Sequence, residues 1–238
     1  MPTSPQPVLI LGGFLITAEA YAPMVDTLAR LSGQPVRLVP VSRLEWVLTV
    51  FPFAWARILD RVTTAAADLA RDSPTGRITL VGHSSGGILL RLFLSDLPFQ
   101  GRVYGGRRRA DRLICLGSPH TARQATPLRA MVDRELPGAF HGDQVRYVSV
   151  AGAIQLDPAA GDASDTARRL APTAYRTSTV NPDDRGYGLV PVSGALLAGS
   201  RPIVLEGVAH GGAFGPRWYG SPEVVERWWK AAEGKRQE

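Results

Sequence analysis

The stretch that decides the fold is Gly82-His83-Ser84-Ser85-Gly86, which follows the apolar run 78–81 and precedes the apolar, helix-like run 87–94. A G-x-S-x-G pattern between a buried strand and a helix is typical of a sharp turn that presents its serine as a nucleophile. Both outer positions must be small, because a side chain there would collide with the tight backbone. We expect the turn to lift Ser84 Oγ above the sheet edge and to aim the Ser85 N–H at the same point. An ordinary loop serine is the alternative, which the flanking patterns disfavour.

Short apolar runs alternate with helical patterns along the chain. Such runs are expected for parallel strands that are buried on both faces. The alternation predicts an α/β fold, a mostly parallel, doubly wound sheet of about six strands flanked by helices, in a single domain spanning 1–238. Function is then expected outside the carboxyl ends of the strands. The expected strands are 8–11, 36–39, 78–81, 112–116, 147–151 and 202–205, and the expected helices are 18–31, 54–71, 85–96, 125–134 and 222–232.

Several classes of protein are disfavoured by composition. No apolar run reaches the roughly 18 residues of a membrane span, so no stable membrane insertion is expected. Residues 1–7 carry no positive charge and no signal pattern, which predicts a cytoplasmic protein. Cys115 is the single cysteine and lies in an apolar run, so we expect a buried structural thiol. The four histidines form no ligand cluster, and neither a metal nor a cofactor is expected.

The net charge is +6, and 25 of the 27 basic residues are arginine. The densest cluster is Arg107-Arg108-Arg109, which follows Gly105-Gly106. A basic patch can bind nucleic acid or an anionic membrane. This cluster is short and contains no aromatic residue, which favours a solvated loop and no nucleic-acid partner.

The loop Gly12-Gly13-Phe14 follows the first predicted strand. Its two glycines let the backbone turn sharply and expose N–H groups. Given the serine turn at 82–86, we interpret this loop as half of an oxyanion hole, in which the Phe14 N–H faces the Ser85 N–H. A plain strand-to-loop turn is the alternative.

His210 follows the last predicted strand, where a base must lie to reach Ser84. The other three histidines are less well placed. His83 lies inside the serine turn and is expected to pack beneath it, His120 is expected to be structural or on a pocket rim, and His141 lies in a polar loop. His210 is therefore the predicted catalytic base.

An acid that orients the histidine is expected in the loop 181–192, between the last two predicted strands. Asp184 and Asp183 are both candidates. The sequence Pro-Asp-Asp-Arg-Gly is also good turn chemistry, so these aspartates have a purely structural alternative.

Substrate class must come from the pocket walls, and the segment 44–55 is unusually rich in aromatic residues. Either it packs into the core as an irregular helix, which is the safer interpretation, or it forms a lid or acyl-chain wall. A wall would favour apolar acyl groups, with Trp46, Phe51 and Phe53 as substrate-binding residues. Segments 121–145 and 155–185 are too short for a separate cap domain, so we expect an open, shallow site.

Together these segments resemble the α/β-hydrolase superfamily, and lipase- and esterase-type members in particular, over nearly the whole chain. Two departures stand out. Gly12 occupies the place of the histidine in the His-Gly pair that many such proteins carry, and Tyr187 stands where relatives carry the triad aspartate of Gly-Asp-Gly. The segments that carry the resemblance are 11–14, 82–86, 117–120, 188–197, 205–210 and 218–222.

The resemblance implies a serine hydrolase that cleaves a small-molecule carboxylic ester with an apolar acyl group. Ser84, His210 and Asp184 would form the catalytic triad, and Phe14 and Ser85 the oxyanion hole. Tyr187 leaves two alternatives open, a Ser–His dyad and a non-catalytic or weakly active binding protein. An acyltransferase or amidase on the same fold is a third. Acyl-chain length and oligomeric state are not indicated by the sequence.

Overall fold

The computed structural model describes residues 5–121, 125–154, 161, 163–169 and 190–234. Its strands form one sheet in the order β2-β1-β3-β4-β5-β6, and every neighbouring pair is parallel. The predicted doubly wound parallel sheet is therefore confirmed. The strands are β1 (Val8–Leu11), β2 (Val36–Val39), β3 (Ile78–His83), β4 (Ala110–Leu116), β5 (Arg146–Ala153) and β6 (Arg201–Glu206).

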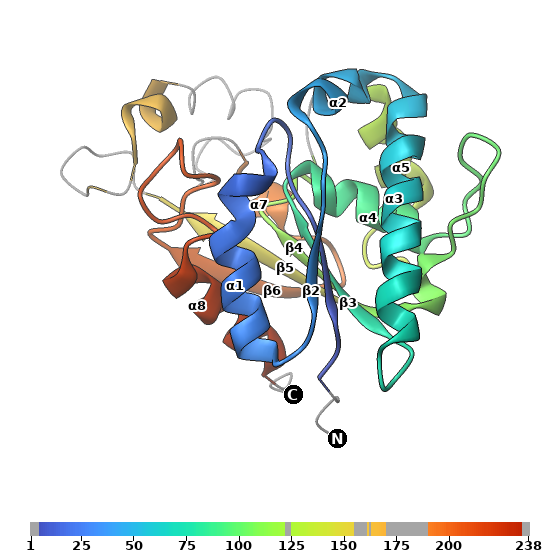
Figure 1. Cartoon of the computed structure of the whole chain (residues 1–238). Coiled ribbons are helices and arrows are strands. Elements are labelled where there is room, and N and C mark those ends of the chain that lie inside the picture. Colours follow the sequence, from blue (N-terminus) through green and yellow to red (C-terminus); the bar gives the residue numbers. More distant parts are fainter. Residues whose placement is uncertain (1–4, 122–124, 155–160, 162, 170–189, 235–238) are drawn as a thin grey trace.

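Helices cover both faces of the sheet (Figure 1). Alternate residues of β1 point to opposite faces: Val8 and Ile10 pack with α1 and α8, whereas Leu9 and Leu11 pack with α3 and α4. Two apolar layers result, one on each side of the sheet. The helices are η1 (Ala18–Tyr21), α1 (Ala22–Ser32), α2 (Arg43–Val47), η2 (Leu48–Val50), α3 (Pro52–Arg71), α4 (Ser85–Leu94), η3 (Gly106–Arg108), α5 (Pro127–Glu135), α7 (Val192–Ala195) and α8 (Pro222–Glu233).

Strand β3 is longer than predicted and ends inside the serine turn. His83 pairs with Leu116 of β4, and the Ser84 N–H donates to the Leu116 carbonyl at 2.9 Å. All of β3 is buried because it lies in the middle of the sheet with helices on both faces. The strand therefore delivers Ser84 to the carboxyl edge on a rigid, fully covered support.

The Arg107–Arg109 cluster lies in and beside η3, and two of its three side chains contact acidic or amide groups. Arg107 and Arg108 both form ion pairs with Asp96, and Arg108 lies 3.2 Å from it. Arg107 Nε also donates to Gln144 at 3.0 Å. These contacts fix the loop to the chain that follows α4, so a structural explanation accounts for the cluster.

Cys115 is buried in β4, as predicted, and burial raises the pKa of its thiol to about 12. Within the described ranges, no helix is both long enough and apolar enough to cross a membrane. The cytoplasmic location and the single domain spanning the whole chain stay predictions.

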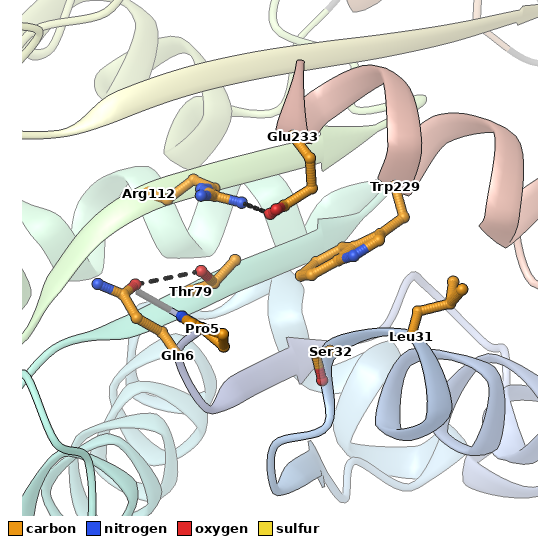
Figure 2. Close-up of a pocket in the computed structure, with 8 residues that line it drawn as sticks. All are labelled: Pro5, Gln6, Leu31, Ser32, Thr79, Arg112, Trp229 and Glu233. Atoms are coloured by element: carbon orange, nitrogen blue, oxygen red, sulfur yellow. Dashed lines mark hydrogen bonds and ion pairs between the residues drawn. The ribbon is translucent and has the colours of Figure 1, made fainter. Parts of the chain in front are cut away.

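A small hollow of about 80 Å³ lies at the amino ends of the strands (Figure 2). Its polar groups pair with one another: Arg112 of β4 forms an ion pair with Glu233 of α8, and Thr79 donates to Gln6 at 3.3 Å. Arg112 is almost fully buried. The ion pair between Arg112 and Glu233 thus attaches the end of α8 to the sheet, at the edge opposite Ser84.

Candidate active site

The turn at Ser84 has the strained geometry expected of a serine nucleophile between a strand and a helix. Ser84 has φ 51° and ψ −123°, in a region that residues with a side chain rarely adopt. A Cβ added to Gly82 would lie 2.5 Å from Gly87 Cα, and one on Gly86 would lie 2.2 Å from the Leu11 carbonyl oxygen. The expected need for small residues on both sides of the serine is thus met, for steric reasons.

Ser84 and His210 meet at the carboxyl edge of the sheet. Nε2 of His210 lies 2.9 Å from Ser84 Oγ, although the two residues are 126 positions apart. The loop that carries His210 is held by a bridge between Ala209 and Trp218, in which the Ala209 N–H donates to the Arg217 carbonyl at 2.8 Å. Both side chains are nearly buried, at 9% and 4% exposure. The neutral imidazole is therefore placed to accept the serine proton.

Burial, and then the neighbouring His83, lower the pKa of His210 well below the usual imidazole value of 6.5. The ring is accordingly neutral at physiological pH, the form that can act as a base. Its Nδ1 is buried and accepts or donates no hydrogen bond to the described residues. A buried ring nitrogen of this kind needs a partner.

The aspartates predicted to supply that partner, Asp183 and Asp184, lie outside the described residues, and so does Tyr187. Their predicted roles stay predictions. Much of segment 155–185, expected to be too short for a cap, lies outside the described ranges as well.

A chain of hydrogen bonds runs beneath the serine turn. The Gly13 N–H donates to Tyr21 Oη at 2.7 Å, Tyr21 Oη lies 2.7 Å from His83 Nδ1, and His83 Nε2 lies 2.8 Å from the His210 carbonyl oxygen. The carbonyl can only accept, so His83 carries its proton on Nε2 and accepts the Tyr21 hydroxyl at Nδ1. Burial lowers the pKa of His83 to about 4, which keeps the ring neutral. As predicted, His83 packs beneath the turn.

The two residues whose N–H groups are predicted to bind an oxyanion lie beside the same pocket as Ser84, and that role stays a prediction. Phe14 and Ser85 both line this pocket. Gly13 lies directly against the serine, since a Cβ added there would be 2.8 Å from Ser84 Cβ. The Phe14 N–H has no acceptor among the described residues, and the Ser85 N–H belongs to the first turn of α4, whose N–H groups have no partner within the helix.

The pocket over Ser84, called here the Ser84 pocket, has a volume of about 620 Å³. Trp46 and Trp55 line it and are also part of the core, which confirms that these residues of segment 44–55 pack inward. A role for Trp46 as an acyl-chain wall stays a prediction. The mostly apolar lining also includes Ile88 and Leu89 of α4.

Phe51 and Phe53, predicted as substrate-binding residues, are not among the described residues that line the Ser84 pocket, and a substrate-binding role for them stays a prediction. They stack on each other at the surface, with ring centroids 5.7 Å apart and exposures of 51% and 44%. The reason is helical periodicity: Phe53 lies two residues before Trp55 on α3, about 200° around the helix, so one faces solvent while the other is buried.

The remaining histidines have structural surroundings. His120 is buried, with Nδ1 3.3 Å from an Arg91 guanidinium nitrogen, and it does not line the Ser84 pocket. The ring of His141 packs edge-on against Phe140. No cluster of three or more His, Cys, Asp or Glu side chains that could hold a metal is present in the described part of the chain.

Neither a protein-family model nor a curated protein sequence matches the chain. Among solved structures, it is similar to Est1E from Butyrivibrio proteoclasticus with ferulic acid bound, at 13% identity over 97% of this chain and 90% of that one, with a TM-score of 0.52. The chain has the α/β-hydrolase fold. An acetylxylan esterase matches at 14% identity over 97% of this chain and 99% of its own, with a TM-score of 0.43. The match to tomato methylketone synthase I, complexed with 2-tridecanone, has 16% identity and a TM-score of 0.36, covering 55% of this chain and 47% of that protein.

Two residues of this α/β-hydrolase fold that contact the site were not anticipated from sequence. Tyr21 is the last residue of η1, directly before α1, and its hydroxyl contacts Gly13 and His83 beneath the serine turn. From sequence, an aromatic residue in an amphipathic helical segment normally indicates core packing alone. Arg129 of α5 lines the Ser84 pocket, and nothing in its local sequence separates it from the other arginines.

Proposed function

We propose that the chain is a serine hydrolase that cleaves carboxylic esters through an acyl-enzyme on Ser84. The observation that carries this proposal is the 2.9 Å contact between Ser84 Oγ and His210 Nε2 at a strained strand-to-helix turn. A serine hydroxyl becomes a nucleophile when an adjacent neutral imidazole can take its proton.

In the proposed acylation step, Ser84 Oγ attacks the ester carbonyl carbon while its proton moves to His210 Nε2. The carbonyl oxygen gains negative charge, and the N–H groups of Phe14 and Ser85 are the proposed donors to it. Donors of this kind stabilise the tetrahedral intermediate more than the substrate and therefore lower the barrier. His210 then gives its proton to the departing alcohol.

In the proposed deacylation step, His210 takes a proton from water as the water oxygen attacks the acyl carbon. The tetrahedral intermediate collapses, the bond to Ser84 Oγ breaks and the proton returns from His210 to the serine. The proposed third member is Asp184, which would accept a hydrogen bond from the His210 Nδ1–H and stabilise the imidazolium. The unpaired Nδ1 described above supports a partner of this type.

The proposed substrates are small-molecule esters with an apolar portion. Support comes from the pocket lining, in which Trp46, Trp55 and Leu89 present apolar surface beside Ser84. A pocket of about 620 Å³ is in the range that holds a small organic molecule.

A binding protein without hydrolytic activity is the second candidate. The tyrosine at position 187, where a triad aspartate was expected, favours it. A phenol can accept a hydrogen bond from imidazole but supplies no charge at neutral pH.

A panel of 4-nitrophenyl esters with acyl chains from short to long tests the proposal, with wild type compared with Ser84→Ala. Hydrolysis by wild type that is lost in Ser84→Ala would support it. Absence of hydrolysis across the panel, with the wild-type chain folded by circular dichroism, would favour the binding protein.

A further inference from the structure

Arg129 is the one charged side chain among the described residues that line the Ser84 pocket. It lies in the first turn of α5, whose N-cap Thr126 also lines the pocket. The rest of the described lining consists of apolar residues and neutral polar ones. A single arginine therefore sets the charge of an otherwise uncharged cavity that opens onto the proposed nucleophile.

The Arg129 guanidinium is incompletely satisfied by the described residues. Nη2 donates to the Pro119 carbonyl at 3.0 Å, whereas Nε is buried without a hydrogen-bond partner. No described carboxylate lies within ion-pair distance of Arg129. A half-buried guanidinium in this state favours an anion, because removing a cation from water is costly unless it is paired.

A second guanidinium lies close to the first: Arg91 contacts the ring of His120, the residue that follows the Pro119 to which Arg129 donates. Arg91 is 3% exposed and its guanidinium donates to the Leu136 carbonyl. The carboxylate nearest to Arg91 is that of Asp133, at 3.9 Å, and it is half-exposed. Burial, and then the charges of Arg91 and Arg129, lower the pKa of His120 well below its usual value. The half-exposed Asp133 therefore acts electrostatically on both guanidinium groups, but it forms no ion pair with Arg129.

We propose that Arg129 is a specificity-determining residue that binds a carboxylate carried by the substrate, in addition to the ester that is cleaved. The preferred substrate then joins an apolar segment, packed on Trp46 and Trp55, to a carboxylate that meets the guanidinium. The planar fork of arginine matches a carboxylate better than a neutral amide or hydroxyl. That this carboxylate belongs to an ester substrate rests on the proposed hydrolysis at Ser84, but the anion site itself does not.

Binding to the Ser84→Ala chain tests the anion site without any need for turnover. The probes are 6-phenylhexanoate and its neutral analogue 6-phenylhexanamide, titrated by isothermal calorimetry and by tryptophan fluorescence. We expect the carboxylate to bind roughly tenfold or more tightly than the amide, as charge-assisted hydrogen bonds typically allow. Adding Arg129→Met should reduce the preference to less than about twofold. Equal binding of both probes to the parent, or a preference that survives Arg129→Met, would overturn the proposal.

Arg134→Met is the matched control, because Arg134 lies on the same helix, is exposed and pairs with its neighbour Glu135. It should keep the full preference for the carboxylate. If Arg129→Met unfolds, Arg129→Lys keeps the charge but loses the fork. Arg129→Lys should then bind the carboxylate more weakly than the parent while binding the amide equally, and unchanged carboxylate binding would overturn the role of the fork.

Hydrolysis supplies a second readout that separates this inference from the proposed function. Wild type should hydrolyse mono-4-nitrophenyl adipate with a higher kcat/KM than 4-nitrophenyl hexanoate. Arg129→Met should remove that advantage, whereas Arg134→Met should keep it. A preference for the carboxylate in binding, without hydrolysis of either ester, would contradict the proposed function and leave the anion site standing. Hydrolysis of both esters at equal kcat/KM, with no preference for the carboxylate probe in binding, would contradict the anion site and leave the proposed function standing.

Discussion

His83 donates from Nε2 to the main-chain carbonyl oxygen of His210 at 2.8 Å. The residue directly before the proposed nucleophile thus holds the segment that carries the proposed base. On its other side, His83 accepts the hydroxyl of Tyr21, which in turn accepts the Gly13 N–H. The serine turn, the glycine loop and the histidine loop are therefore joined by one buried hydrogen-bond chain, each link of which has a fixed donor and acceptor.

Tyr21→Phe should weaken this chain without changing the shape of the core. The substitution removes the acceptor for the Gly13 N–H and the donor to His83, and leaving such groups unpaired in the interior costs on the order of 1–3 kcal/mol. We expect unfolding free energy to fall by about that amount and kcat to fall as well, measured by urea denaturation and by ester hydrolysis. Tyr104→Phe is the control, since the Tyr104 hydroxyl makes one long contact, 3.4 Å to the Ala56 carbonyl, and Tyr104 does not line the Ser84 pocket. Equal losses in the two variants would contradict a special role for Tyr21.

Stability should decrease as the pH falls below about 6.5, where unfolded histidines take up protons. In the folded chain, burial lowers the pKa of His83 to about 4 and the pKa of His120 and His210 below the usual value. The folded state therefore stays unprotonated in a range where the unfolded state binds protons. Each such histidine lowers the free energy of unfolding by up to about 1.4 kcal/mol for each unit by which the pH falls. Urea denaturation at about pH 7, 6 and 5 measures this, and constant stability over that range would contradict neutral buried histidines.

His210→Ala should reduce kcat about as much as removal of the serine, because the two act as a unit. For wild type, kcat/KM should stay level down to a pH below 6.5 and only then fall, since the pKa of the base is lowered. His120→Ala is the comparison, because His120 is buried but does not line the Ser84 pocket. A larger loss of kcat in folded His120→Ala than in His210→Ala would show that the base is misassigned.

Asp184→Asn should lower kcat by orders of magnitude if Asp184 is the partner of His210 Nδ1, since an amide in this place favours the unsuitable tautomer and costs about 10⁴ in a comparable triad. Asp183→Asn should be milder, because its expected role is the Pro-Asp turn. If neither change matters, a Ser–His dyad is favoured, and Tyr187→Asp becomes informative. A large gain in ester hydrolysis in Tyr187→Asp would indicate a triad that has lost its acid.

Sequence patterns predicted β1 and β2 to the residue and every other strand to within two residues at each end. Buried parallel strands are nearly continuous apolar runs, and turn residues bound them sharply. The strand positions also allowed Ser84 and His210 to be placed together, because both residues follow strands whose carboxyl ends lie at the same edge of the sheet.

The pocket walls were harder to predict because they depend on which face of a helix meets the cavity. Phe53 and Trp55 are equally apolar, yet only Trp55 is on the buried stripe that continues through Ile58, Leu59 and Val62. Arg129 reaches the pocket because α5 packs beside α4, a tertiary relationship that no local pattern reveals. The role of the Tyr21 hydroxyl could not be predicted for a similar reason, since its partners Gly13 and His83 lie at the ends of two different strands.

The most direct test of the central claim is covalent labelling with a fluorophosphonate, followed by mass spectrometry of the modified peptide. Such a probe reacts with a serine that an adjacent base activates. Wild type should be modified stoichiometrically at Ser84, Ser84→Ala should lose the labelling and His210→Ala should show a strong reduction. No modification of folded wild-type protein, or modification at another serine that persists in Ser84→Ala, would contradict it.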